Sequence, residues 1–259
     1  MLAEERRQRI AFLLKNEKRV SVSELSKTYG VSEETIRRDL EKLEMDGLAR
    51  RTYGGALINE DGHNETPYDI RKRSDVEAKH TIAALAAELI SNGDYIMLDE
   101  SSTSFYIASE LKSIKDLTVI TNSMEIVSEI AGVQGWTVLC TGGQKRASAP
   151  SFAGHQAENM VRSYHVDKAI ISCDSLDITA GFTDRHEDTA LIKQAMMASA
   201  RQVVLAVDHS KFDRVAFAGI GDLSRLTYVI TDEKPDDKWL SAFEKYGIKL
   251  LYANGRQKQ

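Results

Sequence analysis

The chain has 259 residues, of which 42% are hydrophobic and 28% are charged. This length suggests one or two domains, and this composition is ordinary for a protein that buries its own core. Two cysteines exclude a disulfide framework and fit a reducing compartment. No apolar run approaches the ~20 residues that span a bilayer, and the first residues lack the apolar region of a signal peptide. These features favour a cytoplasmic protein without a membrane partner.

Charge is unevenly distributed along the chain, whose formal net charge is −5. Residues 1–57 contain 12 basic and 10 acidic residues, whereas the remainder contains 22 basic and 29 acidic residues. A weakly basic segment joined to an acidic one suggests two separate roles. Chance also produces an imbalance of this size, so charge alone does not assign nucleic-acid binding.

The first 57 residues predict three short helices. Apolar residues at helical spacing indicate a helix over residues 3–16. The capping-box pattern Ser-Val-Ser-Glu at residues 21–24 begins a second helix, and Gly30 permits the left-handed turn that ends it. A third helix is expected after Ser32, with acidic residues in its first turn and a buried stripe of Ile36, Leu40 and Leu43.

The outward face of the third helix carries arginine and threonine near its N-terminal end. Such a face can enter the DNA major groove, where arginine can bind guanine O6 and N7 and threonine can contact a base or phosphate. The segment from Leu48 to Leu57 predicts a hairpin with Gly54 and Gly55 as its turn, and it would lie as a wing along a phosphate backbone. A solvated helix with ordinary surface charges is the simpler alternative, which periodicity alone favours.

Residues 59–78 predict a linker, because they are polar and contain glycine and Pro67. Helix and strand patterns then alternate over residues 79–252. Continuous apolar strands between helices indicate an α/β fold class with a mostly parallel sheet covered on both faces. The predicted domains are therefore residues 3–58 and residues 79–252, and the predicted strands lie near residues 95–98, 117–120, 137–140, 166–173, 203–207, 228–230 and 248–251.

Small polar loops follow five of these strands. The carboxyl ends of parallel strands meet at one edge of a sheet, where open α/β sheets bind ligands. Hydroxyls and backbone N–H groups at a helix N-terminus suit a phosphate. Any single loop is more simply a cap or a turn, whereas five at one edge favour a small polar ligand. The candidate ligand-binding residues are Asp99, Ser101, Ser102, Thr103, Asn122, Ser123, Gly143, Asp174, Asp208 and Lys211.

Other combinations of reactive residues give weaker signals. The six histidines show no metal-ligand spacing, so neither a metal nor another cofactor is expected. Cys140 and Cys173 end strands and are expected to be small buried residues. The sequence contains neither a GxSxG nucleophile elbow nor a P-loop. The consecutive residues Asp208, His209 and Ser210 are poorly placed for a hydrolase triad, whose members converge from separate positions.

Several motifs of the first domain resemble the DeoR family of bacterial transcription regulators. They are AEERRQRI from Ala3, VSELS from Val22 and VSEETIRRDL from Val31, continued by LEMDGL and RRTYGGA. The resemblance covers the whole first domain and implies a winged helix–turn–helix that binds operator DNA. It implies DNA contacts from the recognition helix and from the wing, where Tyr53 stands in place of the histidine of many members. The implied contact residues are Thr35, Arg37, Arg38, Arg50, Arg51 and Tyr53.

Residues 79–252 resemble the effector domain of the same family, which is similar in fold to ribose-5-phosphate isomerase and binds phosphorylated sugars or related metabolites. Two loops depart from the family pattern: Ser101 replaces the glycine of Asp-x-Gly-[Ser/Thr]-Thr, and Ser-Cys-Asp at 172–174 replaces Gly-Ala-Asp. Lys193 lies in a matching segment and would pair with a phosphate or with a neighbouring carboxylate. Lys193 and Lys211 are the cations expected to balance a phosphate beside Asp99.

The sequence therefore predicts a transcription regulator and not an enzyme. The expected protein represses a sugar-catabolism operon as a homodimer or homotetramer, under the control of a phosphorylated sugar. The alternative is a sugar-phosphate isomerase-like enzyme fused to a DNA-binding unit, with Asp99, Asp174, Glu187 and Lys193 as available groups. The sequence shows no glycine-rich lysine loop of the isomerase kind, and an architectural DNA-binding protein would not need such polar strand-end loops.

Overall fold

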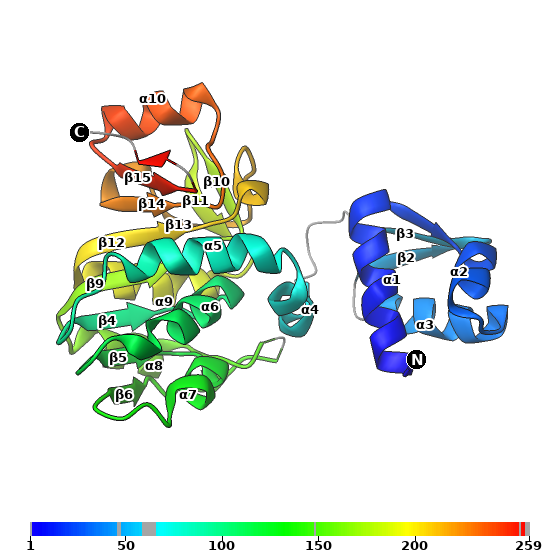
Figure 1. Cartoon of the computed structure of the whole chain (residues 1–259), viewed down its shortest axis with the longest axis horizontal. Helices are drawn as coiled ribbons and strands as arrows, with labels where there is room; N and C mark the ends of the chain where they lie inside the picture. The colour runs from blue at the N-terminus through cyan, green and yellow to red at the C-terminus, as the bar shows by residue number, and fades with distance from the viewer. Residues whose placement is uncertain (1, 46–47, 59–65, 148, 254, 257–259) are drawn as a thin grey trace. The chain divides into compact units, whose positions relative to one another are not determined.

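The computed structural model describes residues 2–45, 48–58, 66–147, 149–253 and 255–256. The chain divides into two compact units, Met1–Ser74 and Asp75–Gln259 (Figure 1). Of the predicted linker, residues 59–65 lie outside the described residues. Its second half contains the short helix α4 (Tyr68–Arg73) and the beginning of α5 (Val76–Ala87). No helix in the described part of the chain is long and apolar enough to cross a membrane.

The first unit combines three helices with a small antiparallel sheet. The helices are α1 (Ala3–Glu17), α2 (Val22–Tyr29) and α3 (Glu33–Met45). The strands β1 (Arg19–Ser21), β2 (Ala49–Thr52) and β3 (Gly55–Ile58) pair in the order β1-β3-β2. The predicted helices and hairpin are confirmed, but the sequence reasoning missed β1, whose three residues are too few to show a period.

The core of the first unit includes the predicted stripe of α3. Ile10 and Leu14 of α1 are buried together with Ile36, Leu40 and Leu43 of α3. A buried ion pair, Arg6 Nε to Asp39 Oδ2 at 2.6 Å, joins α1 to α3. The turn between α2 and α3 is left-handed at Gly30, with φ of 63°.

The two predicted helix caps differ in outcome. Ser32 caps α3, since its hydroxyl accepts a hydrogen bond from the backbone N–H of Thr35 at 3.2 Å. The capping box predicted at residues 21–24 is wrong, because the Ser21 hydroxyl bonds to the Ser23 hydroxyl instead. A missing cap costs about 1 kcal/mol. Burial of Val22 and Leu25 contributes about 1.5–3 kcal/mol each, so α2 forms without the box.

The second unit is built on an eight-stranded sheet of order β16-β15-β14-β12-β9-β4-β5-β6. All neighbouring pairs are parallel except β15 with β16, which confirms the mostly parallel sheet. The strand bounds are β4 (Tyr95–Leu98), β5 (Thr118–Thr121), β6 (Thr137–Cys140), β9 (Val166–Ile171), β12 (Ala200–Ala206), β14 (Tyr228–Ile230), β15 (Lys249–Tyr252) and β16 (Gly255–Arg256).

Helices cover both faces of this sheet (Figure 1). Along β4, Ile96 and Leu98 pack toward α5, α6 (Ser102–Glu110) and α7 (Met124–Ile130). Met97 points to the other face, which packs on α8 (His155–Arg162), α9 (Glu187–Ala198) and α10 (Asp237–Lys245). The alternation of side chains along each strand thus creates two separate apolar layers, as expected for strands buried on both sides.

Two smaller β elements lie beside the main sheet and were not predicted. Strands β10 (Ser175–Asp177), β11 (Gly181–Asp184) and β13 (Ala218–Gly221) form an antiparallel sheet, and β7 (Gln144–Lys145) pairs with β8 (Phe152–Ala153). The short 3-10 helices are η1 (Leu111–Ser113), η2 (His209–Lys211) and η3 (Leu223–Arg225). The β7–β8 hairpin and η2 both border the loops that follow the strands of the main sheet.

Two adjacent glycines of the wing provide a matched stability test. A Cβ on Gly55 would lie 1.9 Å from the carbonyl oxygen of Val20, whereas nothing lies within 4 Å of the same position on Gly54. We expect Gly55→Ala to lower the unfolding free energy of the first unit by at least ~1–3 kcal/mol through overpacking, and Gly54→Ala to change it little.

Hydrogen exchange measured separately on peptides of the two units tests this expectation. Both tryptophans, Trp136 and Trp239, lie in the second unit, so their fluorescence should be unchanged in both variants. Equal protection of the first unit in the two variants would show that β1 does not need a glycine opposite it.

Candidate functional site

The exposed face of α3 carries the predicted DNA-contacting side chains. The Arg38 side chain is 77% exposed and lies 3.6 Å from Glu34, and the Arg37 side chain is 51% exposed and bonds to Glu33 at 2.9 Å. Thr35 shares a hydroxyl hydrogen bond with Ser32 at 2.9 Å. Exposed pairs one helical turn apart contribute only about 0.3–0.5 kcal/mol, so both arginines can exchange these partners for others.

The wing places its three predicted residues differently from one another. Arg50 is exposed, and Tyr53 at the turn is fully exposed. Arg51, in contrast, is bound to α3: its backbone N–H and its Nε each donate to Glu44 at 2.8 Å. These hydrogen bonds from Arg51 lower the pKa of Glu44. Arg51 therefore fixes the wing to the helix, and part of its charge is already balanced.

Asp99 organises the turn between β4 and α6. Its carboxylate is fully buried and accepts from Ser101 N at 3.1 Å, from the Ser104 hydroxyl at 2.6 Å and from Ser172 N at 2.8 Å. Ser101 has φ of −66° and caps α6 by accepting from Ser104 N at 3.0 Å. The position therefore needs no glycine, and the serine hydroxyl stabilises the helix start.

Lys193 of α9 is buried between carboxylates. Its Nζ donates to Asp184 Oδ2 at 2.7 Å and lies 3.3 Å from Asp99 Oδ2. Burial alone would lower the pKa of Lys193, but the carboxylates of Asp184, Asp99 and Glu100 outweigh it and raise the pKa above its ordinary value. Of the two partners that the sequence left open for Lys193, the structure shows the carboxylate.

Glu100 and Asn122 extend this cluster toward the β7–β8 hairpin. Asn122 Nδ2 donates to Glu100 Oε2 at 2.9 Å. Burial raises the pKa of Glu100, while the charges of Lys193 and Arg146 oppose that rise. Arg146 is itself buried and bonds through Nε to Asp188 Oδ2 at 3.1 Å. The cluster therefore joins the ends of β4 and β5 to the hairpin and to the first turn of α9.

A second group of charges lies after β12. Asp208 caps η2 by accepting from Ser210 N at 2.9 Å. Its burial would raise its pKa, but Lys211, the Ser210 hydrogen bonds and Lys79 hold that pKa below its ordinary value. Lys79 comes from α5 and is only 3% exposed.

The remaining predicted residues have other contacts. Asp174 pairs with Arg185 at 3.0 Å and is half-buried. The Ser123 hydroxyl caps α7 by accepting from Ile126 N at 3.3 Å. Gly143 has φ of 106°, and a Cβ there would lie 2.8 Å from the carbonyl oxygen of Ala153, so this glycine permits the hairpin to pack. Ser102 and Thr103 are buried in the first turn of α6.

The two cysteines differ, which corrects one expectation. Cys173 is buried, and burial raises the pKa of its thiol. Cys140 is exposed, contrary to the prediction, because it ends β6 at the edge of the sheet.

Sequence reasoning missed several residues of the site. Lys79 carried a usable signal, because it precedes Ile82 and Ala83 by three and four positions and so shares the buried face of α5. Asp184 ends a strand that was not predicted. Arg146 and Ser151 lie in the short β7–β8 hairpin, where no periodicity marks them.

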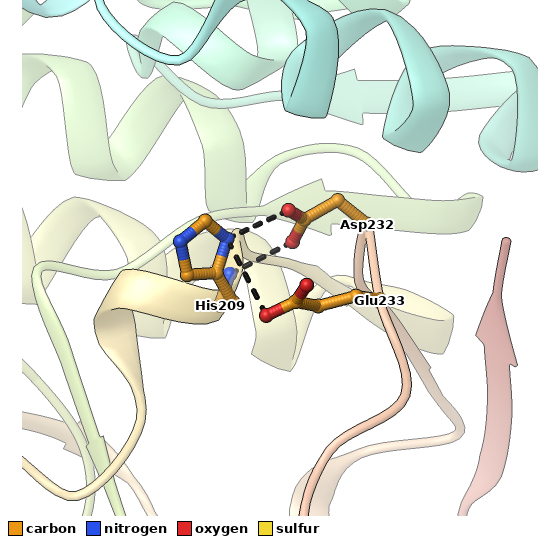
Figure 2. A group of neighbouring side chains, drawn as sticks. All are labelled: His209, Asp232 and Glu233. Carbon is orange, nitrogen blue, oxygen red and sulfur yellow. Dashed lines mark hydrogen bonds and ion pairs between the residues drawn. The ribbon is translucent and has the colours of Figure 1, made fainter.

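His209 lies beside the second charge group and contacts two acidic residues. Figure 2 shows the Asp232 and Glu233 carboxylates on the same side of its imidazole. His209 Nδ1 is 2.7 Å from Asp232 Oδ2, and His209 N donates to Asp232 Oδ1 at 2.8 Å. The Asp232 hydrogen bond raises the pKa of His209, so this contact adds stability at low pH and loses it as pH rises through the raised pKa.

One ring nitrogen of His209 and one carboxylate oxygen each of Asp232 and Glu233 lie within 4.8 Å of one another, a spacing that could hold a metal ion. The imidazole nitrogen that faces the carboxylates is already bonded to Asp232, however, and half of the ring is exposed. We therefore interpret the group as structural: the two hydrogen bonds between His209 and Asp232 join η2 to the loop after β14. They thereby help to position Asp208 and Lys211, which lie on either side of His209 in the chain.

Removal of Lys193 would leave Asp99 and Asp184 buried without their shared cation. Breaking a buried pair from one side costs about 3–5 kcal/mol. We expect Lys193→Met to lower the unfolding free energy of the second unit by about that amount, measured by urea denaturation with Trp239 fluorescence. Lys168→Met is the control, because Lys168 contacts a single carboxylate, that of Asp94 at 2.7 Å, which is less buried than Asp99. Equal losses in the two variants would contradict a special role for Lys193.

Comparisons with known proteins match both units. The DeoR-like helix-turn-helix domain matches residues 6–61, and the DeoR C terminal sensor domain matches residues 74–233. An uncharacterized HTH-type transcriptional regulator of Bacillus subtilis, YulB, is 38% identical over 96% of each chain. The putative aga operon transcriptional repressor of Escherichia coli O157:H7 is 34% identical over 95% of this chain and 93% of that protein.

Two further similarities are more distant. The glycerol-3-phosphate regulon repressor of Escherichia coli K12 is 29% identical over 92% of this chain and 94% of its own. The solved structure of ribose 5-phosphate isomerase A from Methanocaldococcus jannaschii covers 54% of this chain and 55% of its own, with 18% identity and a TM-score of 0.40.

The curated relatives are named as regulators of transcription and not as enzymes, which decides against the isomerase-type alternative. The matches extend through a DNA-binding motif and a sensor domain and cover nearly the whole chain. The chain therefore belongs to the DeoR family of transcriptional regulators.

Proposed function

We propose that this regulator represses a sugar-catabolism operon and that a phosphorylated sugar controls its binding to operator DNA. The observation that carries the proposal is the buried polar site at the strand ends of the sensor unit, joined in one chain to an exposed helix face that carries Arg37 and Arg38. The names of two relatives support it, since one is named a putative aga operon transcriptional repressor and another a glycerol-3-phosphate regulon repressor.

On the DNA side, α3 enters the major groove and the wing lies along the backbone. Thr35, Arg37 and Arg38 contact base edges, and a bidentate arginine–guanine contact is worth about 1–3 kcal/mol. That exceeds the value of the exposed pairs with Glu33 and Glu34, so the arginines change partners on binding. Arg50, Tyr53 and the uncompensated part of Arg51 contact phosphates. A homodimer or homotetramer presents two such helices to two half-sites.

On the effector side, the phosphate lies at the N-terminus of α6, beside Ser101, Ser102 and Thr103. The first N–H groups of a helix have no partner within the helix and favour an anion. Lys193 is shared between two carboxylates, and we expect Lys211 and Lys79, which act on Asp208, to add further positive charge near the phosphate. The sugar hydroxyls bind Asn122, Asp174 and Asp208, with Ser123 and Gly143 lining the adjoining turns.

Lys79 is also placed so that effector binding could influence DNA binding. It lies in the first turns of α5, five residues after Ser74, where the first unit ends. A ligand that engages Lys79 therefore acts on the segment that follows the junction of the two units. A difference of about 1–3 kcal/mol in ligand affinity between two states of that segment is enough for typical allosteric control.

The double variant Arg37→Ala, Arg38→Ala tests the DNA-binding surface. We expect each lost base contact to cost about 1–3 kcal/mol of discrimination between the operator and unrelated DNA. Fluorescence anisotropy with a fragment from the regulated promoter and a scrambled fragment measures this. Binding should also weaken as salt rises, because Arg50 and Arg51 are expected to displace counterions from the phosphate backbone.

Arg162→Ala is the matched control, because Arg162 is exposed on α8 of the sensor unit. This variant should bind the operator as the unchanged chain does. Unchanged operator affinity and selectivity in the double variant would remove α3 as the recognition helix.

The variant Thr103→Val tests the phosphate position, because it preserves side-chain volume and removes the hydroxyl. We expect it to lose most of its affinity for the phosphorylated sugar in calorimetry, with unchanged secondary structure. In the unchanged chain, a hundredfold excess of ligand over its dissociation constant should add about 2.7 kcal/mol of stability.

Thr118→Val provides the control, since Thr118 lies at the first residue of β5, away from the loops that follow the carboxyl ends of the strands. It should bind the sugar phosphate normally. If Thr103→Val also binds normally, or if the unphosphorylated sugar binds as tightly as its phosphate ester, the α6 turn is only a helix cap.

A further inference from the structure

Three buried polar atoms beside the strand-end site have no hydrogen-bond partner among the described residues: Asn122 Oδ1, Ser151 Oγ and Thr189 Oγ1. Asn122 and Ser151 are 0% exposed and Thr189 is 3% exposed. Roughly nine in ten or more buried polar groups in proteins are hydrogen-bonded. Three exceptions in one connected group point to a bound molecule that supplies the missing partners.

The orientation of the Asn122 amide determines which partner is missing. Its Nδ2 donates to Glu100 Oε2 and to the Phe152 carbonyl oxygen, both at 2.9 Å. A carbonyl oxygen only accepts, so the amide nitrogen must face Phe152 and the assignment of nitrogen and oxygen is settled. Oδ1 therefore remains an acceptor. The missing partner is a hydrogen-bond donor, such as a hydroxyl, and an ionised phosphate oxygen cannot fill that role.

The β7–β8 hairpin links Asn122 to Ser151 and to α9. Phe152 N donates to the Asn122 carbonyl oxygen, and Arg146 N donates to the Ser151 carbonyl oxygen, both at 2.9 Å. Arg146 Nε then bonds to Asp188 Oδ2 at 3.1 Å. Asp188 Oδ1 in turn accepts from the backbone N–H of Thr189 at 2.8 Å.

Residues of α9 connect Thr189 back to Asn122. Lys193 lies four residues after Thr189 and therefore shares its helix face. Its Nζ is 3.3 Å from Asp99 Oδ2, and the neighbouring Glu100 accepts from Asn122. This series of contacts connects the end of β5, the hairpin and the start of α9 to the residues that follow β4.

We propose that Asn122, Ser151 and Thr189 form an uncharged subsite that binds hydroxyl groups on the carbon chain of the effector. This inference rests on the proposed function, since it assigns the part of the ligand that lies away from the phosphate. An amide oxygen accepts, and the two hydroxyls each donate and accept, which matches neighbouring hydroxyls of a polyol. The subsite distinguishes phosphorylated sugars by the placement of their hydroxyls.

An unpartnered buried hydroxyl lowers the stability of the unliganded protein. The variants Ser151→Ala and Thr189→Val should therefore melt at the same or a higher temperature than the unchanged chain when no ligand is present. A hydroxyl with a structural role gives the opposite result. Ser199→Ala is the matched control: its buried hydroxyl donates to the Val161 carbonyl oxygen at 3.3 Å, so this variant should melt at a lower temperature.

The binding experiment uses the full chain, inorganic phosphate, glycerol 3-phosphate and a panel of pentose and hexose phosphates. Calorimetry first identifies the sugar phosphate that binds the unchanged chain best. We expect the double variant Ser151→Ala, Thr189→Val to bind that compound at least roughly tenfold more weakly. Its affinity for inorganic phosphate should equal that of the unchanged chain, and Ser199→Ala should bind both compounds normally.

The other outcomes overturn the subsite in distinguishable ways. Equal affinity of the double variant for the sugar phosphate leaves the proposed function standing and removes the subsite, whose atoms then bind water only. A lower melting temperature of the unliganded variants shows that the hydroxyls have partners within the chain. If the double variant binds inorganic phosphate more weakly than the unchanged chain does, Ser151 and Thr189 contact the phosphate and not the sugar hydroxyls. If nothing in the panel binds the unchanged chain, the proposed effector class fails and the subsite fails with it.

Discussion

The sensor unit depends on one buried cation, the ammonium group of Lys193. Asp99, Glu100 and Asp184 converge at the carboxyl ends of the strands, and buried carboxylates cost several kcal/mol each without compensation. The contacts of Lys193 at 2.7 Å and 3.3 Å let β4, β11 and α9 meet there. Asp99 then holds the α6 turn and β9 through its remaining hydrogen bonds, so the geometry of the α6 turn depends on the neutrality of this cluster.

Buried and exposed ion pairs have different roles in the two units. The buried Arg6–Asp39 pair locks α1 against α3, as the Lys193 cluster locks the strand ends. Arg37 and Arg38 form exposed pairs instead, which are weak and easily exchanged. The side chains that fix α3 are therefore separate from those that face outward on it, and the outward surface can vary without loss of the fold.

The sequence predicts what repeats with a regular period, and it fails where structure is short or irregular. The stripe of Ile36, Leu40 and Leu43 and the parallel strands were correct because burial follows the helix and strand periods. The β7–β8 hairpin has two-residue strands and so leaves no period, which is why Arg146 and Ser151 escaped notice. Hydrogen-bond choices, such as the rejected capping box at Ser21, depend on competing partners that sequence does not show.

Charge balance also restricts how the strand-end site can recognise a ligand. Lys193 and Arg146 already face carboxylates, so neither offers its full charge to an incoming anion. Besides Lys211 and Lys79, the groups that the proposed effector would meet are those whose hydrogen-bonding capacity is not used within the site, namely helix N–H groups, hydroxyls and the Asn122 amide oxygen. Such groups are directional and short-ranged, so they respond to where a hydroxyl lies more than to net charge. The neutral hydrogen-bonding groups of this site therefore surround an ionic cluster whose charges are already paired.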